Sequence, residues 1–311
     1  SGNSIRYRVP EYDVETGKCR NGQKEKMVQE TELPVLSHIQ AETLLRARKE
    51  GLSAVMISPD LGISQVAVAL SDDGVTFPGG AQISWKQVEK IRASENNCFV
   101  LEEAGIRSIQ VFSEETNRMC SLLPTKSTPT MLIAGFTMHR IVDTDPLQDT
   151  MKKMATITPV TGRVLDTATG LGYTAIAAAR TASEVVTIEL DPGAQVIARQ
   201  NPWSRELFQN PRIRQVMGDA FEVVPTFEDA SFSSIIHDPP VFKLAGDLYS
   251  GEFYRQLYRI LQRGGRLFHY IGDLNSKSSG TVAHGALKRL QEAGFKRVVR
   301  RPEAFGVVAY K

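Results

Sequence analysis

From Arg163 onward, short apolar runs that suit buried strands alternate with segments whose apolar residues recur at helical spacing. This alternation is typical of an α/β fold in which crossover helices connect the strands of a parallel sheet. We expect strands at 164–166, 185–190, 213–217, 234–238 and 265–270, and helices at 173–180, 192–201, 251–261 and 281–293. The runs 295–300 and 306–310 leave no room for a helix between them, so they predict an antiparallel pair that closes the sheet.

The length of 311 residues and a change in character along the chain predict more than one domain. Residues 1–34 are mostly polar and charged and predict a loosely held extension. Residues 35–125 predict a small, strand-rich α+β domain, with a helix over 36–51 and a hairpin at Asp73-Gly74. Residues 126–311 form the predicted α/β domain.

A helix is expected just before the first strand of the α/β domain. Asp145 can cap it, Pro146 suits its first turn, and Gln148 stands where a capping box places Gln. Leu147, Met151 and Met154 then fall on one face, and the helix is expected to lead into the α/β domain.

Composition narrows the class of protein. The formal net charge of +2 lacks the excess of basic residues that proteins held mainly by phosphate contacts usually show. No apolar run approaches the length of a membrane span, and no signal-peptide core is visible, so we expect a cytoplasmic protein without a membrane partner. The three cysteines are far apart and odd in number, which predicts reduced thiols and no metal site.

Four strand ends carry residues that suit ligand binding. The first strand leads into a small-residue turn, Asp166 to Gly172, followed by a helix, and such a turn lets a ligand approach backbone amides closely. Tight packing of helix on strand explains the two glycines equally well. Glu189 ends the second strand 23 residues after Asp166, near the spacing at which an acid meets ribose hydroxyls.

The third and fourth strand ends add two further acids. Asp219 suits a hydrogen bond to an adenine amino group, although a helix cap would explain it as well. Asp238 is followed by Pro239 and Pro240, and two prolines fix the backbone without supplying a competing amide hydrogen. A simple strand terminator is the alternative.

Together these strand ends resemble the class I S-adenosylmethionine-dependent methyltransferases, over roughly 144–311, and most of all uncharacterised archaeal and bacterial members with an Asp-Pro-Pro motif. The resemblance implies a Rossmann-like seven-stranded sheet behind a smaller α+β domain, with S-adenosylmethionine as cofactor. It implies cofactor contacts from the glycine-rich turn, the ribose-binding strand end and the adenine-binding strand end: Asp166, Ala168, Gly170, Gly172, Glu189, Leu190, Asp219 and Ala220. Ala168 departs from the Gly usual in the family, and Phe242 stands one place later than the usual aromatic.

The same resemblance implies that Asp238, Pro239 and Pro240 position an amine nitrogen for methyl transfer. His237 and Tyr249 are candidates for proton removal or substrate contact, although a histidine beside a buried strand is more often a core residue. Arg140 can pair with the cofactor carboxylate, or it can be a surface arginine.

Two other functions stay open. Residues 248–254 also resemble spermidine synthases, which implies aminopropyl transfer from decarboxylated S-adenosylmethionine, but the turn after the first strand lacks the acid that those enzymes use. A non-catalytic recognition module is the third class. The acceptor is not defined: a small amine and an RNA base are both compatible with the sequence, as is a homo-oligomer.

Overall fold

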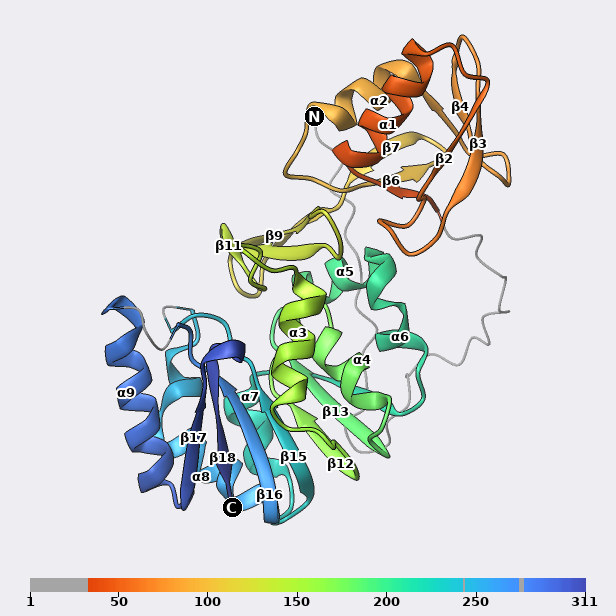
Figure 1. The fold of residues 1–311 in the computed structure, drawn as a ribbon. Helices are drawn as coiled ribbons and strands as arrows, with labels where there is room; N and C mark the ends of the chain where they lie inside the picture. Colours follow the sequence, from red (N-terminus) through yellow and green to blue (C-terminus); the bar gives the residue numbers. More distant parts are fainter. Residues whose placement is uncertain (1–32, 243, 274–276) are drawn as a thin grey trace. The chain divides into compact units, whose positions relative to one another are not determined.

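A computed structural model describes residues 33–242, 244–273 and 277–311 (Figure 1). Almost all of the predicted 1–34 extension lies outside these ranges. Between Leu33 and Leu123 the chain forms two small helices and several short strands. The helices are α1 (His38–Lys49) and α2 (Trp85–Arg92), and the strands are β1 (Val35–Leu36), β2 (Ala54–Ile57), β3 (Val66–Leu70), β4 (Gly74–Thr76), β5 (Gln82–Ser84), β6 (Phe99–Glu102), β7 (Gly105–Ser108), β8 (Gln110–Ser113) and β9 (Arg118–Leu123).

The leading part of the chain is α+β, as expected, with strands β2-β3-β4-β5 in one antiparallel sheet and β1-β6-β7 in another. The predicted helix and hairpin are both present. The chain changes sheets at Ile109, whose amide donates to the carbonyl of Cys98 while its own carbonyl accepts from Leu122.

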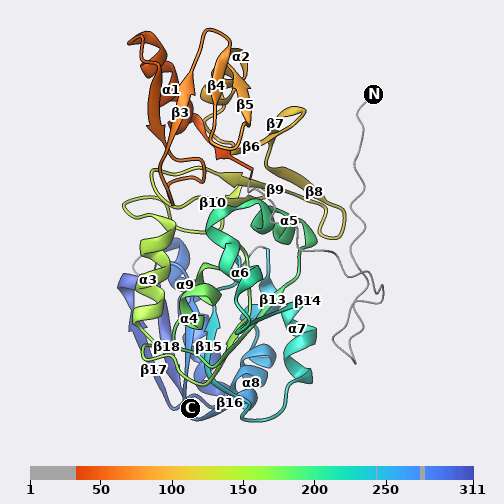
Figure 2. The same ribbon diagram turned by 90° about the vertical axis from the view of Figure 1, so that its right-hand side faces the viewer.

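A third sheet, in the order β11-β10-β9-β8, connects this leading part to the α/β domain. It includes β10 (Thr130–Ile133) and β11 (Phe136–Thr137), so the boundary predicted at residue 125 falls between two of its paired strands. The side chain of Thr116, in the β8–β9 turn, donates to Asp191 at the start of α5 (Pro192–Gln200) at 2.7 Å. Figure 2 shows β8 and β9 lying beside this helix.

The α/β domain contains the seven-stranded sheet that the sequence predicts, in the order β14-β13-β12-β15-β16-β18-β17. All neighbours are parallel except those of β18, which pairs antiparallel with β16 and β17. Its strands are β12 (Arg163–Asp166), β13 (Glu184–Glu189), β14 (Ile213–Met217), β15 (Phe232–His237), β16 (Leu261–Tyr270), β17 (Arg297–Arg301) and β18 (Gly306–Tyr310). Its other helices are α3 (Pro146–Ala155), α4 (Tyr173–Ala179), α6 (Arg205–Gln209), α7 (Ala220–Val223), α8 (Gly251–Ile260) and α9 (Lys277–Glu292).

Both faces of the sheet are buried. Neighbouring residues on a strand belong to different cores, as Val164 and Leu165 show, because side chains alternate across a strand. Helices α3, α4 and α5 cover one face, and α8 and α9 cover the other (Figure 1). Burial on both faces explains the continuous apolar runs of these strands. Among the described helices, none combines the length and the apolar character that crossing a membrane requires.

Helix α3 carries charged residues on its buried side. Asp145 caps it through the amide of Gln148, as expected, and Leu147 and Met151 are about 40% exposed. The buried side carries Asp149 and Lys153, with exposed fractions of 0% and 2%. Charged residues therefore occupy positions of this helix that face the domain.

The turn before α4 depends on Gly172, which caps that helix with a φ of +76°. A Cβ added there would lie 2.7 Å from the Leu207 side chain. We expect Gly172→Ala to lower the free energy of unfolding by about 3 kcal/mol, through left-handed strain and this clash. The matched control is Gly51→Ala, where φ is +71° but no atom lies within 4 Å, and it should cost only about 1 kcal/mol. Denaturant unfolding measures both, and equal losses would contradict the clash.

Candidate active site

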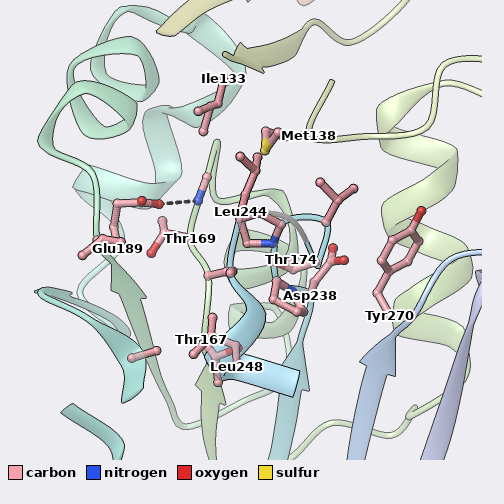
Figure 3. A pocket seen from close by; sticks show the side chains of 18 of the residues that line it. Ile133, Met138, Thr167, Thr169, Thr174, Glu189, Asp238, Leu244, Leu248 and Tyr270 are labelled. Atoms are coloured by element: carbon pink, nitrogen blue, oxygen red, sulfur yellow. Dashed lines mark hydrogen bonds between the residues drawn. The ribbon is translucent and has the colours of Figure 1, made fainter. Parts of the chain in front are cut away.

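A cavity of about 360 Å³ lies at the carboxyl ends of the central strands of the α/β sheet. Side chains and backbone from the ends of β12, β13 and β15 line it, and residues of β10 and β11 complete the wall on another side. Figure 3 shows Glu189 and Asp238 on opposite sides of this cavity, with Ile133 and Met138 above them. The strand ends that the sequence singles out therefore meet at one site.

Ten of the predicted site residues line the cavity: Arg140, Ala168, Gly170, Glu189, Leu190, Asp219, Ala220, Asp238, Pro239 and Pro240. The other four, Asp166, Gly172, His237 and Tyr249, lie behind the wall and do not line it.

Glu189 is held by backbone amides at the edge of the glycine-rich turn. One carboxylate oxygen accepts from the Gly170 amide at 2.8 Å, and the other accepts from the Asp191 amide at 3.0 Å. Burial raises the pKa of Glu189 to about 7, although both amide hydrogen bonds oppose the rise. Each oxygen keeps a lone pair, so the carboxylate can accept two further hydrogen bonds from hydroxyl groups.

Asp219 caps a helix and also lines the cavity. Its Oδ1 accepts from the Phe221 amide at 2.8 Å and so caps the short helix α7. The same residue lines the cavity, directly followed by Ala220, whose small side chain leaves room beside it. The hydrogen bond from Phe221 therefore fixes the carboxylate of a residue that lines the cavity.

Asp166 lies beneath the cavity and is not part of its wall. It is fully buried, and its Oδ2 accepts from the hydroxyls of Thr174 and Thr187 at 3.1 and 3.0 Å. Its Oδ1 is buried without a hydrogen-bond partner, and burial raises the pKa of the carboxyl to about 7. Asp166 therefore ties the first turn to β13, which makes it a supporting residue rather than a ligand contact.

His237 is a buried core residue. One ring nitrogen lies 2.7 Å from the Thr167 hydroxyl and the other lies 2.9 Å from the Leu248 carbonyl. Burial lowers its pKa to about 3, so the ring is neutral at pH 7 with both nitrogens engaged. We give it no chemical role.

Tyr249 also lies behind the wall of the cavity. It is 3% exposed, and its hydroxyl donates to the carbonyl of Pro240 at 3.1 Å. Its contact with the proline segment supports a role in fixing that segment, not in proton removal.

Asp238 has a partner that the sequence analysis does not anticipate. Its Oδ2 accepts from the Lys153 ammonium at 2.6 Å, and Lys153 also lies 2.9 Å from a carboxylate oxygen of Asp149. The Tyr270 ring covers the same ammonium at 4.6 Å. Burial raises the pKa of Asp238, while the charge of Lys153 opposes that rise.

The sequence does carry a signal for this group. Asp149 and Lys153 are four residues apart, so a helix places them on the same side as an ion pair. Tyr270 stands at the end of β16, where the next strand end reaches the cavity.

Known proteins resemble this chain in sequence and in fold. Residues 165–269 match the family described as "Methyltransferase domain". The uncharacterized protein MJ1233 of Methanocaldococcus jannaschii is 41% identical over 237 residues, which cover 76% of this chain and 80% of that protein. The chain belongs to the MJ1233 family.

Within the MJ1233 family, this member contains a region that matches a methyltransferase domain. "Polyamine aminopropyltransferase 2" of Streptomyces coelicolor is 32% identical over 99 residues, which span 30% of this chain and 18% of that protein. A crystal structure of spermidine synthase in complex with the transition state analogue AdoDATO superposes with a TM-score of 0.53 at 18% identity, covering 66% of this chain and 74% of the other. That likeness shows a shared fold.

The buried acid beneath the cavity makes stability depend on pH. Asp166 has an ordinary pKa of 3.8, and folding raises it to about 7, so the unfolded chain loses this proton first as pH rises. Between about pH 4 and pH 7 the folded state therefore becomes progressively less stable relative to the unfolded chain. Asp166→Asn removes this contribution, so the free energy of unfolding of this variant, relative to that of wild type, should rise by about 4 kcal/mol from pH 4 to pH 8.

Denaturant unfolding at several pH values measures this difference. The exposed residue Asp72 offers a control, because Asp72→Asn removes a carboxylate that stands in solvent. A difference between Asp166→Asn and wild type that stays constant over this pH range would contradict the assignment.

Proposed function

We propose that this protein transfers a methyl group from S-adenosylmethionine to a nitrogen atom of its acceptor. The observation that carries the proposal is that Gly170, Glu189, Asp219 and Asp238, from four separate strand ends, line one cavity. Its volume of about 360 Å³ lies in the range of small-molecule sites.

The residues present suit the donor. The turn of small residues offers backbone amides, Glu189 can accept two hydrogen bonds from a ribose, and Asp219 can accept one from an adenine amino group. Arg140, 20% exposed in the wall of the cavity, suits the carboxylate of the methionine part. S-Adenosylmethionine, when bound, supplies a methyl group on a positively charged sulfur that becomes a neutral thioether after transfer.

The residues around Asp238 suit the acceptor. Oδ1 of Asp238 and the carbonyl of Pro239 can accept hydrogen bonds from an N–H group, which turns the nitrogen lone pair toward the methyl. The nitrogen forms the new bond to carbon while the carbon–sulfur bond breaks and its electron pair stays on sulfur. One nitrogen proton then passes to water. The hydrogen bond from Tyr249 to Pro240 keeps the proline segment in place.

Aminopropyl transfer from decarboxylated S-adenosylmethionine is the second candidate. The partial sequence match to polyamine aminopropyltransferases and the fold shared with spermidine synthase favour it. Two features favour methyl transfer. The turn Thr167-Ala168-Thr169 carries no acid for the donor amine, and Arg140 suits a carboxylate that the decarboxylated donor lacks.

Donor preference tests the proposal. We expect calorimetry to show that wild-type protein binds S-adenosylmethionine at least about tenfold more tightly than the decarboxylated donor, because a buried guanidinium–carboxylate pair is worth more than a neutral contact. Arg140→Leu should remove most of this preference. A stronger affinity for the decarboxylated donor would contradict methyl transfer.

Two further variants separate donor binding from transfer in the same assay. Glu189→Ala should weaken binding of S-adenosylhomocysteine by about 1.5 to 3 kcal/mol, through loss of charge-assisted hydrogen bonds. Asp238→Ala should leave that affinity near wild type and abolish transfer of labelled methyl groups to amine-bearing small molecules. Equal and small effects from both variants would contradict the division of roles.

A further inference from the structure

The acceptor side of the cavity contains four charged side chains that form a connected cluster. Lys153 contacts Oδ2 of Asp238 at 2.6 Å and Asp149 at 2.9 Å, and Arg140 contacts the other oxygen of Asp149 at 3.4 Å. The exposed fractions are 0% for Asp149, 2% for Lys153, 15% for Asp238 and 20% for Arg140. Two carboxylates and two cations are thus buried together.

The charges in this cluster balance one another. Burial by itself lowers the pKa of Lys153, but the carboxylates of Asp238 and Asp149 raise it above its ordinary value, so the ammonium keeps its proton. Arginine is always charged in proteins. The two cations therefore pair with the two carboxylates and balance their charge.

Other titratable groups near the cluster do not add negative charge on the acceptor side. Burial lowers the pKa of His139 to about 3, and burial raises the pKa of the Tyr270 hydroxyl, so both are neutral at pH 7. Arg118 also lines the cavity and contributes a further cation. Glu189 and Asp219 lie at the strand ends assigned to the donor.

A polyamine entering this site would lose hydration and meet carboxylates that already have partners. The cost of burying a charge is offset only where an opposite charge is free to pair with it. An uncharged nitrogen with N–H groups meets no such cost, and Oδ1 of Asp238 and the Pro239 carbonyl remain to accept its hydrogens.

We propose that Lys153, with Arg140, leaves the acceptor site without net negative charge, so that the site takes an uncharged amine or amide nitrogen and rejects polycationic amines. Lys153 is a positioning residue in this proposal: it acts through Asp238, whose second oxygen it leaves aimed at the acceptor. The inference rests on the proposed function and names the class of acceptor for it.

Putrescine binding to the complex with S-adenosylhomocysteine tests this inference. We expect wild-type protein, saturated with S-adenosylhomocysteine, to show no heat of binding with millimolar putrescine. Lys153→Met leaves one uncompensated carboxylate, so putrescine affinity should rise at least about tenfold. The double variant Asp149→Asn with Lys153→Met restores the balance and should reject putrescine again.

Lys152→Met is the matched control, since it removes the same charge from the same helix at a partly exposed position that does not line the cavity. It should behave as wild type. Lys153→Gln replaces Lys153→Met if the latter does not fold, because glutamine can still donate to a carboxylate.

The outcomes distinguish this inference from the proposed function. Putrescine binding to wild type, or unchanged rejection in a folded Lys153 variant that binds S-adenosylhomocysteine, would overturn the acceptor site without net negative charge. Failure of wild type to bind S-adenosylhomocysteine at all would contradict the proposed function itself.

Discussion

The contact between Lys153 and Asp238 is the interaction on which the site depends. It joins helix α3, which precedes the sheet, to the end of β15, four strands later in the chain. An ion pair buried to this degree is costly unless its remaining lone pairs and protons also find partners. Asp149 and the Tyr270 ring supply such partners, and together they fix where the carboxylate of Asp238 lies.

The parallel sheet explains how residues far apart in the sequence come to this place. Because β12, β13 and β15 run in the same direction, their carboxyl ends meet at one edge, and Gly170, Glu189 and Asp238 lie at or shortly after these ends. Burial on both faces leaves this edge as the place where polar side chains gather. The sheet β11-β10-β9-β8 contributes the opposite wall, through Ile133 and Met138.

Much of this architecture follows from the pattern of the sequence. The strand runs, the antiparallel closing pair and the acids at the strand ends all follow from periodicity and spacing, because parallel strands bury both faces and end at one edge. The orientation of α3 does not follow from this pattern. Asp149 and Lys153 lie on its buried side, and Asp238, the partner of Lys153, is 85 residues further along the chain.

The spacing of residues in the sequence also does not show which of them lie behind the cavity wall. Asp166 and His237 stand at the expected strand ends, but hydrogen bonds with Thr174, Thr187 and Thr167 hold them behind the cavity wall. Departures from local rules at functional sites are expected in folded proteins. In this chain they concentrate on α3 and the residues that it contacts.

A crystal structure with bound S-adenosylhomocysteine tests the central claim most directly. The account predicts the ribose on Glu189, the adenine beside Asp219 and Ala220, and the sulfur facing the proline segment at Asp238. A nucleoside bound outside this cavity, or a sulfur turned away from Asp238, would contradict it.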